Sequence, residues 1–115
     1  MALVLCAGVD ASLVRTRQLI LERDGHVVVP ALDEPTVIAA CSQNEFEVAV
    51  LGHSLTPQAK RRMAGVIREH CTATKVLELY ALSTGKALQD ADAWLEIPSE
   101  GPQELAARVQ DLASK

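Results

Sequence analysis

The chain has 115 residues, a formal net charge of −4 and 49% hydrophobic residues. A chain of this length can bury a core without metals or disulfides, and its composition excludes the disordered and membrane-spanning classes. The acidic balance and the aromatic content of 3% disfavour nonspecific nucleic-acid binding, which depends on a positive surface and on base stacking. Composition therefore predicts a soluble globular domain.

Short apolar runs alternate with segments of helical spacing along the whole chain. Near-continuous apolar runs predict buried strands at residues 3–6, 27–29, 46–51, 75–79 and 93–97. Helical spacing, together with capping residues and prolines at the starts, predicts helices at residues 12–24, 33–41, 56–70, 83–90 and 101–112. Asp10 or Ser12 is expected to cap the first helix, and Gly25 to end it.

This alternation predicts an α/β fold. A single domain is expected over residues 1–115, with a doubly wound five-stranded parallel sheet and helices on both faces. In such sheets ligands bind beyond the carboxyl ends of the strands, beside the switch in strand order. The segments expected there are residues 6–10, 52–54, 80–83 and 97–98.

Three passages resemble a response-regulator receiver domain of the CheY-like type. They are Arg-Asp-Gly-His followed by a strand at residues 23–29, the strand at residues 46–51, and residues 91–98 followed by Pro-Gln-Glu-Leu at 102–105. The resemblance covers nearly the whole chain. It implies the strand order 2-1-3-4-5, a cis proline at Pro98 and a role in bacterial two-component signalling.

A receiver transfers a phosphoryl group to a carboxylate at the end of its third strand. It also needs an acidic pair for Mg²⁺, a hydroxyl after strand four and a lysine after strand five. Here the acceptor position is Gly52, and the acidic-pair region, residues 7–10, keeps Asp10 alone. The hydroxyl position is Tyr80 and the lysine position is Ile97.

The resemblance therefore implies a degenerate pseudo-receiver. It is expected to have no enzymatic activity, cofactor or metal, and to act without phosphorylation through a protein partner or a homodimer. No nucleic-acid or membrane partner is expected.

Trp94 matches a receiver aromatic that moves together with the hydroxyl residue. We hypothesise that Tyr80 fills the space this aromatic would enter, so that Trp94 stays outward. The surface from the expected helix at 83–90 to the last helix would then be a constitutive docking or dimer face, with Trp94 and Tyr80 in its interface. The alternative is that Trp94 packs under the last helix.

Residues 5–13 are also similar to the phosphocysteine loop of sugar-phosphotransferase IIB proteins. In that alternative Cys6 is the nucleophile of a phosphoryl carrier. Asp10 weighs against it, because a carboxylate in the loop would repel the phosphate. The three cysteines are odd in number and widely spaced, which is typical of a reducing cytosol and predicts a cytoplasmic protein.

Two further polar groups have structural interpretations. The basic residues Lys60, Arg61, Arg62 and Arg68 lie away from the apolar stripe of their helix, which predicts a solvated face. The passage 52–54, Gly-His-Ser, is expected to have a surface or loop-closing role.

Overall fold

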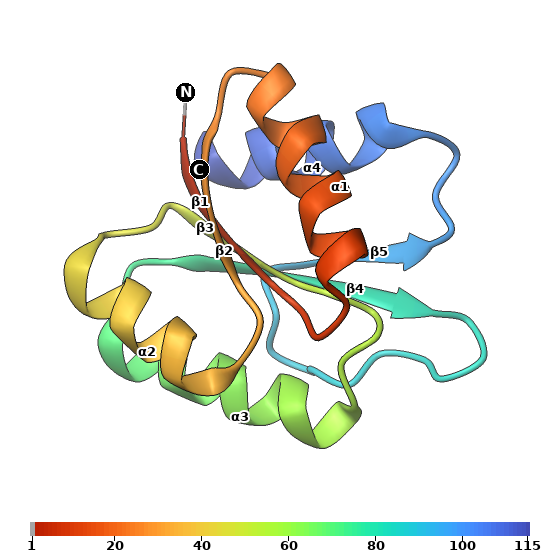
Figure 1. Cartoon of the computed structure of the whole chain (residues 1–115). Coiled ribbons are helices and arrows are strands. Elements are labelled where there is room, and N and C mark those ends of the chain that lie inside the picture. Colours follow the sequence, from red (N-terminus) through yellow and green to blue (C-terminus); the bar gives the residue numbers. More distant parts are fainter. Residues whose placement is uncertain (1) are drawn as a thin grey trace.

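A computed structural model describes residues 2–115, which form a five-stranded parallel sheet with helices on both faces (Figure 1). The strands are β1 (Leu3–Ala7), β2 (Val27–Ala31), β3 (Val48–Leu51), β4 (Lys75–Ala81) and β5 (Ala93–Ile97). The helices are α1 (Ala11–Arg23), α2 (Glu34–Gln43), α3 (Pro57–His70) and α4 (Pro102–Ala113). The strand order β2-β1-β3-β4-β5 confirms the predicted order and fold class.

Two apolar layers hold the helices to the sheet. Helices α1 and α4 cover one face, and α2 and α3 cover the other (Figure 1). Successive residues of a strand point to opposite faces, so Val4 packs with the α1 and α4 layer while Leu5 packs with the α2 and α3 layer. None of the helices within residues 2–115 is long and apolar enough to span a membrane.

The predicted helix starts are confirmed where a side chain caps them. The Asp10 carboxylate accepts hydrogen bonds from the amides of Ser12 and Leu13 and so begins α1. Asp33 and Thr56 cap α2 and α3 in the same way. Gly25 follows α1 with a positive φ of 91°, a conformation that glycine adopts without steric cost.

The helix predicted over residues 83–90 is wrong. The chain between β4 and β5 forms turns and irregular structure, with Gly85 in the left-handed region at a φ of 73°. The amides of Ala87 and Leu88 donate to the Glu78 carboxylate, at 2.7 and 2.8 Å. A buried side chain thus takes the place of the backbone acceptors that a helix would supply.

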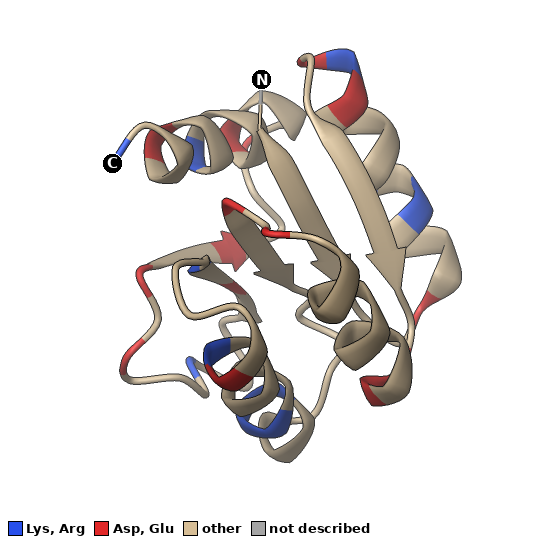
Figure 2. Cartoon of the chain, turned by 90° about the vertical axis from the view of Figure 1, so that its left-hand side faces the viewer, with Lys and Arg blue, Asp and Glu red and all other residues tan. Residues whose placement is uncertain are grey.

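Lys60 is also placed differently from the prediction. Basic positions run along α3 (Figure 2), and Arg61 and Arg62 are exposed, but Lys60 is 2% exposed. Its Nζ donates to Glu78 Oε2 and to the carbonyl of Leu79, both at 2.8 Å. Lys60 precedes Ala64 by four positions, so it belongs to the buried stripe of the helix.

Candidate functional site

The switch in strand order lies between β1 and β3, which pair with Ala7 opposite Leu51. The chain leaves β1 toward α1 on one face and leaves β3 toward α3 on the other (Figure 1). Gly8 and Gly52 follow the two strand ends, and the Gly52 amide donates to the carbonyl of Ala7 at 2.9 Å. This edge is where a doubly wound sheet forms its ligand crevice.

Arg17 extends into this crevice from α1. A Cβ built on Gly52 would lie 2.9 Å from Arg17 Nη1 and 3.3 Å from the carbonyl oxygen of Ala7. The guanidinium therefore uses the space that a side chain at position 52 would need. Arg17 Nη2 lies 2.8 Å from His53 Nδ1, which ties α1 to the loop after β3.

The Arg17 charge is buried without a carboxylate in contact. Arg17 is 7% exposed, and burial lowers its pKa, while the Cys6 thiolate that forms at high pH and the Asp10 carboxylate oppose that shift. Within residues 2–115 the acidic partners of ion pairs are Asp24, Glu34, Glu78 and Asp90, and Arg17 has no ion-pair partner there. Buried charges are normally paired, so this guanidinium is unusual for a protein interior.

His53 is held in its neutral form by the same contact. Arginine nitrogens donate hydrogen bonds, so His53 Nδ1 accepts and the ring proton lies on Nε2. Burial lowers the pKa of His53, as do the charges of Arg17 and Lys60, while Asp10 raises it. Both side chains therefore keep N–H groups that this contact does not use.

The residues predicted for a degenerate phosphorylation site are spread along the carboxyl edge of the sheet. Gly52 is at the switch point, and Asp10 is an exposed helix cap beside it. Tyr80 lies near the end of β4, one strand further along, where it pairs in register with Glu96. Ile97 ends β5, and the peptide bond between Ile97 and Pro98 is cis, as the resemblance implies.

The crevice does not fit a divalent cation of the kind that receiver chemistry uses. Ala7, Gly8 and Gly52 offer no side-chain oxygen, and a Cβ at Gly8 would lie 2.9 Å from Val14 Cγ2. The Arg17 guanidinium already carries a positive charge at this place, and a metal ion there would be repelled by it. In the part of the chain from residue 2 onward, no group of three or more His, Cys, Asp or Glu side chains could hold a metal.

Trp94 packs on the face of the sheet covered by α2 and α3, opposite α4. The indole is half-buried, and its Nε1 donates to the carbonyl of Leu88 at 2.9 Å. Lys86 Nζ lies 4.7 Å from the centre of the Trp94 ring and 5.6 Å from the Tyr80 ring, which are cation–π distances. The loop between β4 and β5 therefore fixes both aromatic rings.

Cys6 is enclosed in the layer between the sheet and α1. Its side chain is 1% exposed, and burial raises its pKa to about 11 against the opposing charge of Arg17. A nucleophilic cysteine needs an accessible thiolate, whereas this thiol is protonated at neutral pH and shielded from solvent. The geometry gives the phosphocysteine alternative no support.

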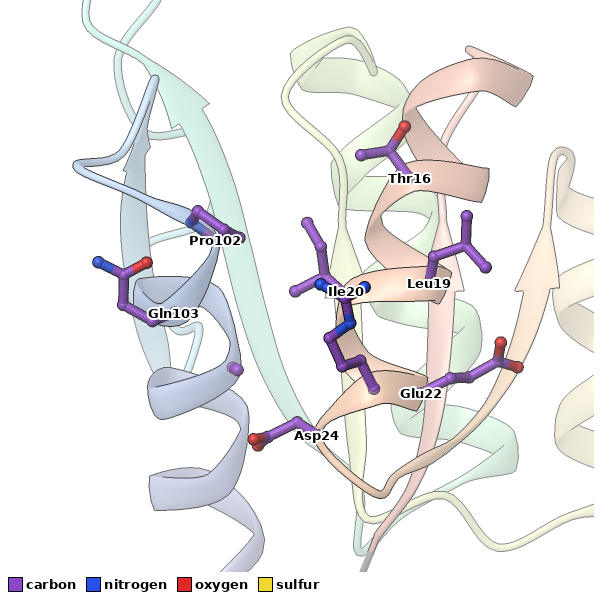
Figure 3. A pocket seen from close by; sticks show the side chains of 9 residues that line it. Thr16, Leu19, Ile20, Glu22, Asp24, Pro102 and Gln103 are labelled. Carbon is purple, nitrogen blue, oxygen red and sulfur yellow. The ribbon is translucent and has the colours of Figure 1, made fainter.

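A separate groove of about 810 Å³ lies between α1 and α4 (Figure 3). Ile20 on α1 points toward α4, and Leu19, Pro102 and Gln103 also line the groove. The groove does not include the residues at the switch point, and no cysteine or histidine lines it. It offers an apolar surface that is flanked by the charged side chains of Glu22, Arg23 and Asp24.

Solved structures with this arrangement are numerous. The receiver domain of the Francisella response regulator 1452 is 22% identical, with a TM-score of 0.82, over 99% of this chain and 98% of that chain. The fold is that of a receiver domain. Vibrio cholerae chemotaxis protein CheY4 is 21% identical, with a TM-score of 0.82, over 97% of this chain and 98% of that one.

A third structure of this fold contains a phosphorylated residue. It is a response regulator from Burkholderia pseudomallei with a phosphorylated aspartic acid and a calcium ion, 19% identical, with a TM-score of 0.79, over 99% of this chain and 69% of that chain. At identities this low the likeness concerns the fold. No family model matches the sequence. No curated protein matches it either.

Arg17 and Glu78, which shape the crevice and the loop between β4 and β5, were missed from the sequence, and Lys60 was assigned to a solvated face. Arg17 had a detectable signal, because Val14, Arg17 and Leu21 have the i, i+3, i+7 spacing of one helix face. Glu78 stands in the middle of an apolar strand, where a lone carboxylate predicts a buried partner. The identity of that partner depended on a contact between distant segments.

Proposed function

We propose that residues 1–115 are a receiver-like signalling domain that works without aspartyl phosphorylation. The observation that carries this proposal is the 2.9 Å between Arg17 Nη1 and a Cβ built on Gly52. Phosphoryl transfer needs a carboxylate nucleophile and cationic groups that stabilise the transferred phosphoryl oxygens. Gly52 offers no nucleophile, and Ile97 offers no charge at the position of the receiver lysine.

On this proposal the domain is not an enzyme and acts through a protein interaction, either with a partner or with a second copy. The surface we assign to it consists of Tyr80, Leu82, Lys86 and Trp94. Leu82 is 75% exposed, and the two aromatic rings are half-buried beside Lys86. Exposed apolar groups combined with aromatic rings are common at interfaces. The three free thiols support a cytoplasmic location.

Covalent labelling tests the loss of phosphorylation. The purified protein would be incubated with Mg²⁺ and acetyl phosphate, and its intact mass measured before and after hydroxylamine treatment. We expect no hydroxylamine-labile phosphoryl adduct, whereas a receiver with an aspartate acceptor, treated in parallel, gains one. A labile adduct on this chain would overturn the proposal.

Light scattering tests the assigned surface. If the partner is a second copy, the wild-type mass rises with protein concentration, and Leu82→Ser returns it to that of a monomer. Leu19→Ser is the matched control, because Leu19 is 50% exposed on α1, away from this surface. Equal effects of the two substitutions, or loss of association through Leu19→Ser alone, would contradict the assignment. A wild type that stays monomeric would exclude self-association.

A further inference from the structure

The crevice at the switch point has the chemistry of an anion site. Its buried charge is the Arg17 guanidinium, which is 7% exposed and has no carboxylate in contact among residues 2–115. Its hydrogen bond to His53 Nδ1 uses one of five N–H donors. The remaining donors of the guanidinium have no ion-pair partner on the described part of the chain.

The free donors of Arg17 are in contact with solvent. Among the described residues, His26 Nε2 is the one enclosed side-chain nitrogen or oxygen without a hydrogen-bond partner. The unbonded nitrogens of Arg17 are therefore not sealed in the interior. Val9, Asp10 and Ser54, which flank the switch point at the carboxyl edge of the sheet, are exposed.

The neighbouring groups favour a negative ligand over a positive one. His53 Nδ1 accepts from Arg17, so the ring carries its proton on Nε2, and Gly8 and Gly52 have no side-chain oxygens. Lys60 adds positive charge near His53, although Glu78 pairs with it. Asp10 is the acid whose charge reaches both Arg17 and His53, and its Oδ1 is engaged in capping α1.

We propose that this crevice binds a small oxyanion, such as inorganic phosphate, through Arg17 and without a metal ion. The planar guanidinium forms paired, charge-assisted hydrogen bonds to phosphate or carboxylate oxygens. The bound anion would neutralise the charge of Arg17, which has no carboxylate in contact. The inference goes beyond the proposed function, because it concerns a ligand of the isolated domain and needs no protein partner.

Amide NMR titration tests the proposal. Inorganic phosphate, acetate and chloride would each be added to the ¹⁵N-labelled protein at constant pH and ionic strength, without divalent cations. We expect saturable shifts of the Gly8, Gly52 and His53 amides with an oxyanion and no saturable shift with chloride. A response to phosphate alone, or to both phosphate and acetate, supports an oxyanion site. The comparison shows whether the site distinguishes the tetrahedral phosphate from the planar carboxylate of acetate. No saturable response to either would overturn it.

Four variants assign the binding to Arg17. Arg17→Gln should weaken binding at least about tenfold, the loss expected for charge-assisted hydrogen bonds. Arg17→Lys keeps the charge without the planar fork, so it tests the same contact if the Gln variant folds poorly. Arg15→Gln, an exposed position on the same helix, is the matched control and should bind as wild type. Asp10→Asn keeps a capping side chain and should tighten binding.

Equal affinities for Arg17→Lys and wild type, or equal losses in Arg15→Gln and Arg17→Gln, would overturn the assignment. The covalent labelling described above uses a different readout. A labile phosphoryl adduct there would refute the proposed function and leave reversible anion binding by Arg17 to be judged on its own titration.

Discussion

Gly52 and Arg17 depend on each other, because the guanidinium occupies the space beside the glycine Cα. Gly52→Ala would place a methyl group 2.9 Å from Arg17 Nη1, so the guanidinium has to move and its bond to His53 weakens. Because the guanidinium is the end of a flexible side chain, we expect the loss in the free energy of unfolding to be about 1 kcal/mol, the worth of the weakened hydrogen bond, measured by urea denaturation.

Gly65→Ala is the matched control for this substitution. A Cβ at Gly65 meets nothing within 4 Å, and the residue is exposed in α3. Alanine should stabilise the helix there by about 0.5–1 kcal/mol. If Gly52→Ala is as stable as wild type, the tight packing of Arg17 against Gly52 is refuted.

His53 makes the stability of the domain depend on pH. Its pKa in the folded protein is lower than the ordinary 6.5, because burial and the charges of Arg17 and Lys60 disfavour its protonation. As the pH falls below 6.5 the unfolded chain binds the proton first, so stability decreases toward acid pH.

The predicted loss of stability at acid pH is checked by measuring the free energy of unfolding of wild type and His53→Gln in urea at pH 7.5 and at about pH 5. Wild type should lose more of its free energy of unfolding than His53→Gln between the two conditions. A larger loss in the variant would mean that folding raises the pKa of His53, which contradicts the contact with Arg17.

Cys6 is expected to react only when the domain opens. Its thiol is 1% exposed and burial raises its pKa to about 11, so alkylation by iodoacetamide at neutral pH should be slow and should accelerate with urea. Peptide mapping by mass spectrometry assigns the modification to this cysteine. Rapid alkylation of the folded protein, slowed by phosphate, would instead favour the phosphocysteine alternative.

Among the secondary-structure elements, the buried ion pair between Lys60 and Glu78 organises the loop that the sequence predicted to be a helix. The Glu78 carboxylate bonds Lys60 of α3 and the amides of Ala87 and Leu88, so the strand fixes both a helix and the following loop. Because Glu78 binds the amides of Ala87 and Leu88, it constrains the loop whose Leu88 carbonyl accepts from Trp94 Nε1. Breaking the buried pair with Lys60 would leave one charge without a partner.

Glu78→Gln should lower the free energy of unfolding by about 3–5 kcal/mol, the cost of an uncompensated buried charge. Faster hydrogen exchange of the Ala87 and Leu88 amides should accompany it. Glu96→Gln on β5 is the control, because that side chain is exposed and its loss should cost less than about 0.5 kcal/mol. Similar costs for the two variants would show that Glu78 does not organise the loop.

The elements that the sequence predicted correctly are those whose signals are local. Asp10, Asp33 and Thr56 cap helices through amides two or three residues away, so the helix starts could be found from spacing. The segment 83–90 could not be assigned in this way. Its amides bond to Glu78 on a neighbouring strand, and that tertiary contact overrides the weak helical spacing of the segment.

At the scale of the whole molecule, alternating strands and helices were enough to predict the parallel sheet and its order. Gly52 and Ile97 could be assigned to the receiver acceptor and lysine positions from the sequence, and the loss of the receiver reaction that they imply stays a prediction. The positive charge of the crevice could not be assigned in this way, since it depends on Arg17 reaching from α1 to the loop after β3. The sheet topology thus followed from the sequence pattern, whereas the charge of the crevice could be found only from the packed structure.

On the proposed function, the Arg17 guanidinium beside Gly52 lies where a receiver would hold its metal ion, and it keeps that ion out. A titration with Mg²⁺ into the millimolar range, at constant ionic strength and followed by the amide resonances of Gly8, Gly52 and His53, tests this most directly. We predict no saturable shift, because Arg17 repels a divalent cation and no carboxylate on the crevice floor attracts one. A saturable Mg²⁺-dependent shift of these amides would contradict the account.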